Sequence, residues 1–84
     1  MKTYLPLGSI VILKEGEKAI MIYGRKQMHK ATEEVFDYVA CLYPEGNLSE
    51  EYTYSFNHEQ IDQVIHTGYS DDDDKTFVEE FLSD

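Results

Sequence analysis

The nine-residue run Val35–Tyr43 constrains the fold most, because it joins β-branched and aromatic side chains with no Gly or Pro inside. The turn cluster Pro44–Asn47 ends it. Alternate side chains of a strand point to opposite faces, which would place Tyr38 on one face and Cys41 on the other. Asp37 is the only charge in the run, so we expect both faces to be largely covered. The strand then lies inside a sheet or in the wall of a small barrel.

Two apolar runs precede this strand. Ile10–Leu13 and Ala19–Tyr23 flank a charged turn with Gly16 at its centre, a pattern that predicts an antiparallel hairpin. Residues 24–34 leave two alternatives open. They form a long hairpin loop, or the second strand continues past Gly24 with a bulge there.

After the turn, Tyr52–Phe56 alternates aromatic and small hydroxyl residues, which predicts a strand with one buried and one wet face. Asn57 with Gln60 three residues later has the spacing of a capping box. We expect it to open a short helical turn with Ile61 and Val64 facing inward.

Residues 64–69 are expected to form a last short strand, and an amphipathic helix ends the chain. The carboxylates of Asp71–Asp74 would interact favourably with the positive end of the helix dipole and so stabilise the start of the helix. Apolar residues then recur at helical spacing over Lys75–Leu82, namely Phe77, Val78, Phe81 and Leu82. We expect this stripe to be buried, on the chain's own sheet rather than in a neighbouring subunit.

These elements predict one α+β domain over residues 1–84. Its sheet would have four to five antiparallel strands, curled or barrel-like, with a short C-terminal helix. At 84 residues the chain is too short for two domains.

The charge of the chain is uneven and argues against nucleic acid and anionic membranes as partners. Residues 45–84 hold one Lys against twelve Asp or Glu, and the net charge is −10. A nucleic-acid binder needs a basic stripe to neutralise phosphates, and none is present. No apolar run approaches membrane-spanning length and no signal peptide opens the chain, so we expect a cytoplasmic protein.

No residue pattern predicts catalysis, a metal or another cofactor. The histidines 29, 58 and 66 do not pair with one another or with Cys41 at ligand spacing. Cys41 is expected to be a buried, inert thiol because it lies within an apolar strand. We therefore expect a protein that is not an enzyme.

Two exposed segments are candidates for binding a partner. The turn with Tyr43, Pro44, Glu45 and Asn47 is either a rigid turn or a recognition loop. Arg25 and Lys26, with His29 and Lys30 nearby, form the one basic cluster of an acidic protein, or simply a solvated loop. The alternating aromatics of Tyr52–Phe56 are more typical of core than of a ligand site.

An ordered set of short motifs resembles a family of small bacterial proteins. The motifs are Tyr4–Val11, Gly24-Arg25, Tyr38-Val39, Leu42–Asn47, Phe56–Ile61 and Gly68-Tyr69. The resemblance is to the domain of unknown function number 4176, found in Firmicutes, and it covers nearly the whole chain.

The resemblance implies a genomic setting near type VII secretion components and their LXG-type toxins. It implies an accessory role as adaptor, chaperone or targeting factor, and it carries no established catalytic residues. Our expectation is a non-enzymatic interaction protein with a protein partner, such as a toxin or a secretion component. The alternative is an immunity protein that caps a cognate toxin, and a homodimer is left open.

Overall fold

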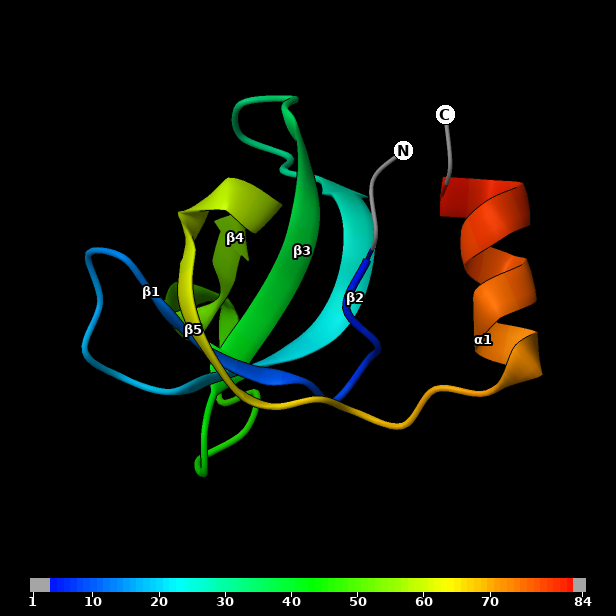
Figure 1. Cartoon of the computed structure of the whole chain (residues 1–84). Helices are drawn as coiled ribbons and strands as arrows, with labels where there is room; N and C mark the ends of the chain where they lie inside the picture. Colours follow the sequence, from blue (N-terminus) through cyan, green and yellow to red (C-terminus); the bar gives the residue numbers. More distant parts are fainter. Residues whose placement is uncertain (1–3, 83–84) are drawn as a thin grey trace.

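The computed structural model describes residues 4–82, which form five strands and a C-terminal helical segment (Figure 1). The strands are β1 (Ile10–Leu13), β2 (Ile20–Met28), β3 (Val35–Leu42), β4 (Tyr54–Phe56) and β5 (Ile61–His66). They form one antiparallel sheet in the order β4-β3-β2-β1-β5. The predicted small α+β fold with a five-stranded sheet is confirmed.

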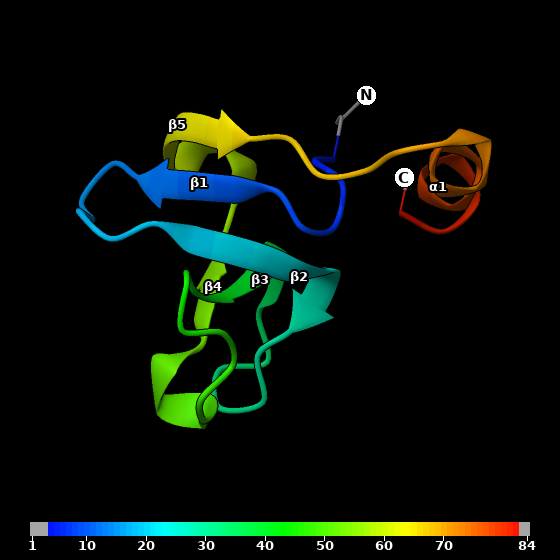
Figure 2. The same cartoon turned by 90° about the horizontal axis from the view of Figure 1, so that it is seen from below.

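The sheet is open, yet its two edges are joined by a very short link. β4 and β5 are the outer strands and are not paired with each other within residues 4–82. Asn57–Gln60 connects them and contains the one-turn 3₁₀ helix η2 (His58–Gln60). Such a turn rises about 2 Å per residue, whereas the outer strands of a flat five-stranded sheet are roughly 19 Å apart. The sheet must therefore curve, as Figure 2 shows.

A bulge at Gly24 decides between the two alternatives for residues 24–34. Ile22 lies opposite Ala40, but Gly24 lies opposite Val39, so Tyr23 is the extra residue in β2. A Cβ at position 24 would lie 2.6 Å from Val39 Cγ1, so any larger residue there would have to displace the Val39 side chain. β2 therefore continues to Met28, and the hairpin loop is confined to residues 29–34.

The core lies on one face of β3, as the strand pattern predicts. Tyr38 and Ala40 are fully buried and pack with Phe56, Tyr4 and residues of β1 and β2. On the other face Cys41 is buried, which confirms its predicted position; its reactivity stays a prediction. Both faces of β3 are largely covered, except at Val35, which is 58% exposed beside the loop at residues 29–34.

Two predictions in the following segment need correction. Tyr52 belongs to a 3₁₀ turn, η1 (Glu50–Tyr52), so β4 is only Tyr54–Phe56. The helical turn predicted over Ile61 and Val64 ends at Gln60, and β5 begins at Ile61 instead of residue 64. The reason is backbone pairing, because Ile61 lies opposite Leu13 of β1 directly after the turn. Ile61 packs against the core as expected, but Val64 is 45% exposed, so its predicted inward position is wrong.

The C-terminal helix begins as predicted. Asp71 is its N-cap and accepts a hydrogen bond from the Asp74 amide at 3.0 Å. α1 (Asp72–Phe77) continues into a π-helical segment, η3 (Val78–Leu82). No helix within the described part of the chain is long and apolar enough to cross a membrane.

The prediction of a fully buried apolar stripe is correct for only half of its members. Leu82 lies in the core and Val78 packs against it. Phe77 and Phe81 are 44% and 65% exposed. Residues 77 and 78 are about 100° apart around a helix, so a helix docked through Val78 and Leu82 leaves the two Phe side chains at its flank.

Candidate binding groove

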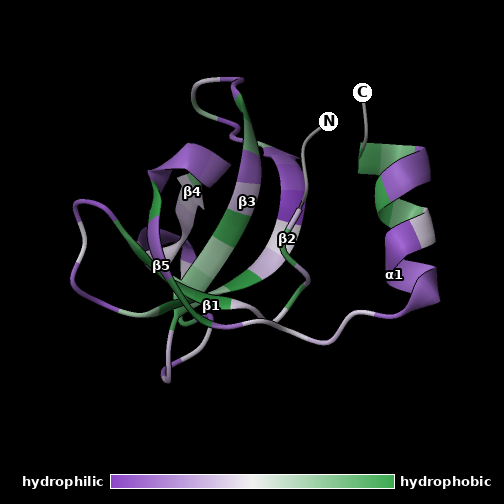
Figure 3. Ribbon diagram, in the orientation of Figure 1, coloured by the Kyte–Doolittle hydropathy of each residue, from purple (hydrophilic) through white to green (hydrophobic). Residues whose placement is uncertain are grey.

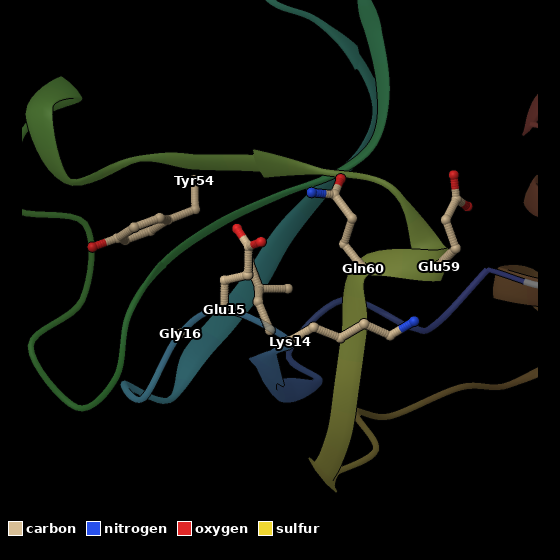
Figure 4. A pocket seen from close by; sticks show the side chains of 7 residues that line it. Lys14, Glu15, Gly16, Tyr54, Glu59 and Gln60 are labelled. Carbon is tan, nitrogen blue, oxygen red and sulfur yellow. The ribbon is translucent and has the colours of Figure 1, made fainter.

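An open pocket lies between the β1–β2 turn, β4 and η2. Its volume is about 410 Å³ and it is lined by Leu13, Lys14, Glu15, Gly16, Tyr54, Glu59 and Gln60. A smaller pocket of about 230 Å³ shares Leu13, Gly16 and Tyr54 and extends along the same turn. We call the two together the Tyr54 groove. Figure 4 shows the Tyr54 ring on one side and Glu59 and Gln60 on the other, with the turn between them.

Backbone hydrogen bonds fix the turn that forms one wall of the groove. The Gly16 amide donates to the carbonyl of Leu13 at 3.0 Å, which closes the turn. The Lys14 amide donates to the carbonyl of Gln60 at 2.9 Å, which ties the turn to η2. Because Leu13 packs against the core, its side chain gives this wall an apolar base.

The opposite wall is η2, which side chains of β3 hold in place. Asn57 and Gln60 form the predicted capping box, with the Asn57 amide donating to Gln60 Oε1 at 2.8 Å. The His58 amide donates to Asp37 Oδ2 at 2.9 Å. The hydroxyl of Tyr38 lies 2.8 Å from His58 Nδ1.

Burial of Tyr38 raises the pKa of its phenol above the usual value, although a hydrogen bond from the Leu5 amide opposes the shift. The hydroxyl therefore stays protonated at neutral pH. It can accept from Leu5 and donate to His58 at the same time. This single side chain links the N-terminal segment, the core and η2, and so places Glu59 and Gln60 at the groove.

The rim of the Tyr54 groove is acidic and its centre is aromatic. Glu15, Glu17 and Glu59 outnumber Lys14 and Lys18 among the lining residues. Lys18 Nζ lies 3.1 Å from Glu45 Oε2, so part of the basic charge is already neutralised. The Tyr54 side chain is 38% exposed, which leaves part of its ring open to a ligand.

The predicted recognition turn lies next to this groove. Tyr43, Pro44, Glu45 and Asn47 are all exposed. The Tyr43 amide donates to the Ala19 carbonyl at 3.1 Å, and the Lys18–Glu45 ion pair joins the turn to Lys18 on the groove. The structure therefore brings the turn and the groove together at one end of the sheet. The binding role of the turn stays a prediction.

Arg25 and Lys26 lie elsewhere and contact the C-terminal helix. Arg25 is only 8% exposed, and its Nη2 lies 2.8 Å from Asp74 Oδ1. Its guanidinium also lies 5.7 Å from the centre of the Phe77 ring, and Lys26 Nζ donates to the Leu82 carbonyl at 3.3 Å. These neighbours would point to opposite faces of a regular strand, but Lys26 has a φ of +50° and both reach the helix. Their binding role stays a prediction.

Acid is expected to loosen this helix attachment. Partial burial raises the pKa of Asp74, but hydrogen bonds from Arg25 and Ser70 outweigh it and hold the pKa below its usual value. The ionised carboxylate thus adds stability that is complete above the unfolded pKa of about 3.9 and is lost as pH falls through the lower folded value. Urea unfolding at pH 7 and pH 2 should show a stability difference between wild type and Asp74→Asn that shrinks in acid. A difference independent of pH would contradict this.

The groove residues were missed from sequence for an identifiable reason. Tyr54 and Phe56 have the same alternation, yet only Phe56 is fully buried. The charged turn at residues 14–18 reads as an ordinary hairpin turn. The sequence does show an aromatic residue, Tyr54, and a turn centred on Gly16. Whether the two lie close together depends on the curvature of the sheet, which the sequence does not show.

Within residues 4–82, no three His, Cys, Asp or Glu side chains gather as a metal site would require. The fold and groove define a small, mostly β, α+β domain with an aromatic surface groove. The chain belongs to the family described as Domain of unknown function (DUF4176), whose model matches residues 4–77. No match was found among curated proteins or among solved structures.

Proposed function

We propose that this chain is a non-enzymatic interaction protein that holds an extended segment of a protein partner in the Tyr54 groove. The observation that carries the proposal is the open groove itself, with an exposed aromatic ring, an apolar base at Leu13 and an acidic rim. Aromatic grooves commonly hold extended segments, and Pro-rich segments suit them best because their polyproline II conformation is formed before binding. The acidic rim favours a segment that carries Lys or Arg.

The free edges of the sheet favour groove binding over strand addition. β4 has only three residues, and short edge strands are poor templates for pairing. β5 has register shifts that leave Asp62 and Ile65 as extra residues against β1. Bulges of this kind protect an edge from pairing with another chain.

The setting we propose is the cytoplasm of a Firmicutes bacterium, as an adaptor or chaperone in type VII toxin secretion. Support comes from the family resemblance, which implies this setting. The alternative is an immunity protein that caps a cognate toxin. The strong acidity of residues 45–84 favours this alternative, since acidic inhibitors can cover basic catalytic surfaces.

Replacement of Tyr54 should distinguish specific binding in the groove from nonspecific binding of the partner elsewhere on the surface. We expect Tyr54→Ala to reduce recovery of the native partner about tenfold, the loss typical of removing an aromatic anchor worth roughly 1.4 kcal/mol. Affinity purification from the native cytoplasm, quantified by mass spectrometry, measures this. Tyr52→Ala is the matched control, because Tyr52 is similarly exposed but does not line the groove.

Equal recovery with both variants would refute the groove as the binding site. Deletion of the gene separates the two roles. Loss of toxin export with normal growth supports an adaptor, whereas growth arrest that is relieved by removing the toxin supports immunity.

A further inference from the structure

Two phenylalanines form an exposed aromatic patch on the C-terminal helix. The rings of Phe77 and Phe81 stack with their centres 5.2 Å apart. They are 44% and 65% exposed, so most of the Phe81 side chain faces water. Figure 3 shows apolar positions in the later half of the helical segment, after a hydrophilic first turn. Isolated exposed apolar residues are ordinary, but two stacked exposed rings form a contiguous apolar surface on which a partner can dock.

The exposure is not the result of a helix that has failed to dock. Val78 and Leu82 already pack on the core, and Asp74 and the Leu82 carbonyl are held by Arg25 and Lys26. Turning the helix to bury the two rings would expose Val78 and Leu82 and separate Asp74 from Arg25. The guanidinium of Arg25 also lies against the Phe77 ring, which fixes the aromatic pair in place.

The charge around the patch selects the kind of partner. Residues 72–82 carry five Asp or Glu and a single Lys, and only Asp74 is neutralised by Arg25. A second copy would bring two acidic helices together, and an anionic membrane would repel this face as well. A partner surface that combines aliphatic side chains with Lys or Arg can bury the two rings and pair with the surrounding carboxylates.

We propose that the Phe77–Phe81 patch is a second docking surface, which binds a cationic amphipathic helix of a protein partner. The two rings are separated by about the distance between neighbouring side chains at i and i+4 on a helix, roughly 5–6 Å. A partner helix can therefore place successive aliphatic residues against both rings. Its flanking Lys or Arg residues face Asp73 and Glu80, which lie on the same side of the helix as the two rings, whereas Glu79 lies about 200° around the helix from Phe77. This surface is distinct from the Tyr54 groove and does not depend on it.

A designed peptide pair tests the proposal on the full chain. The probe is a fluorescent 18-residue helical peptide of Leu, Ala and Lys with one apolar face. The control peptide has the same sequence with Glu in place of each Lys. We expect fluorescence anisotropy to show binding of the Lys peptide and none of the Glu peptide. Phe81→Ser should weaken binding about tenfold, the loss of one aromatic anchor.

Val35→Ser is the matched control, because Val35 is similarly exposed but lies on β3. A second variant, Asp73→Asn with Glu80→Gln, leaves the rings intact and should weaken binding roughly threefold, as expected for exposed ion pairs. Failure of the Lys peptide to bind, or equal binding to wild type and Phe81→Ser, would overturn the proposal. So would self-association in sedimentation that Phe81→Ser abolishes, because a second copy would then be the occupant.

Discussion

Replacement of Gly68 by alanine is expected to lower the free energy of unfolding by about 3 kcal/mol or more. A Cβ at this position would overlap the carbonyl oxygen of Leu7 and lie 2.9 Å from the amide nitrogen of Ser9. Both are backbone atoms and cannot move aside as a side-chain tip can. Relieving the overlap requires the two backbone segments to move apart. That movement would also break the hydrogen bond that the Gly68 amide donates to the fully buried Ser9 hydroxyl.

Urea unfolding followed by tyrosine fluorescence measures this effect. Gly16→Ala is the matched control, since its Cβ would make only ordinary contacts, 3.8 Å from Leu13, and should change stability by less than about 0.5 kcal/mol. A small domain has a total margin of roughly 5–10 kcal/mol, so the Gly68 variant should be clearly destabilised. Equal midpoints for the two variants would show that this contact does not constrain the fold.

The central strand could be predicted because its sequence and its environment agree. The Val35–Tyr43 run alternates as a strand should, and β3 lies inside the sheet. β5 was misread because bulges remove that alternation. Asp62 is an extra residue in the pairing with β1, so Ile61 lies opposite Leu13 and Val64 lies opposite Val11, three residues apart, although only Ile61 packs against the core. Three is also a helical spacing, and the sequence pattern cannot separate the two cases.

The candidate sites depended on contacts between residues far apart in the chain. The turn at Tyr43–Asn47 could be recognised locally from its Pro and Gly residues. The Tyr54 groove could not, because it forms where the curled sheet brings β1 near η2. Arg25 and Lys26 looked like a solvated cluster, yet their partners Asp74 and Leu82 lie 49 and 56 residues away. A sequence pattern predicts which residues share one face of a helix. It does not predict which of them a distant Arg or Lys will contact.

Arg25→Met should cost about 2 kcal/mol of stability and release the C-terminal helix. Met has about the length of the methylene stem of Arg, so the change keeps the apolar packing. It removes the ion pair to Asp74 and the hydrogen bond to the Leu5 carbonyl. Breaking a fully buried pair costs about 3–5 kcal/mol. The Asp74 side chain is 19% exposed, so water recovers part of that loss.

The measurement is a double-mutant cycle with Asp74→Asn, read by urea unfolding, together with amide exchange of the helix. We expect a coupling energy of about 1–2 kcal/mol between the two positions, since they share one hydrogen-bonded contact. Lys18→Met is the matched control. Its ion pair with Glu45 is exposed on both sides, so it should cost less than about 1 kcal/mol. Faster exchange confined to residues 72–82 in Arg25→Met would show that the cation holds the helix to the sheet and fixes the direction in which Phe77 and Phe81 face. Additive single-mutant effects with unchanged exchange would mean instead that Val78 and Leu82 hold the helix without help from Arg25.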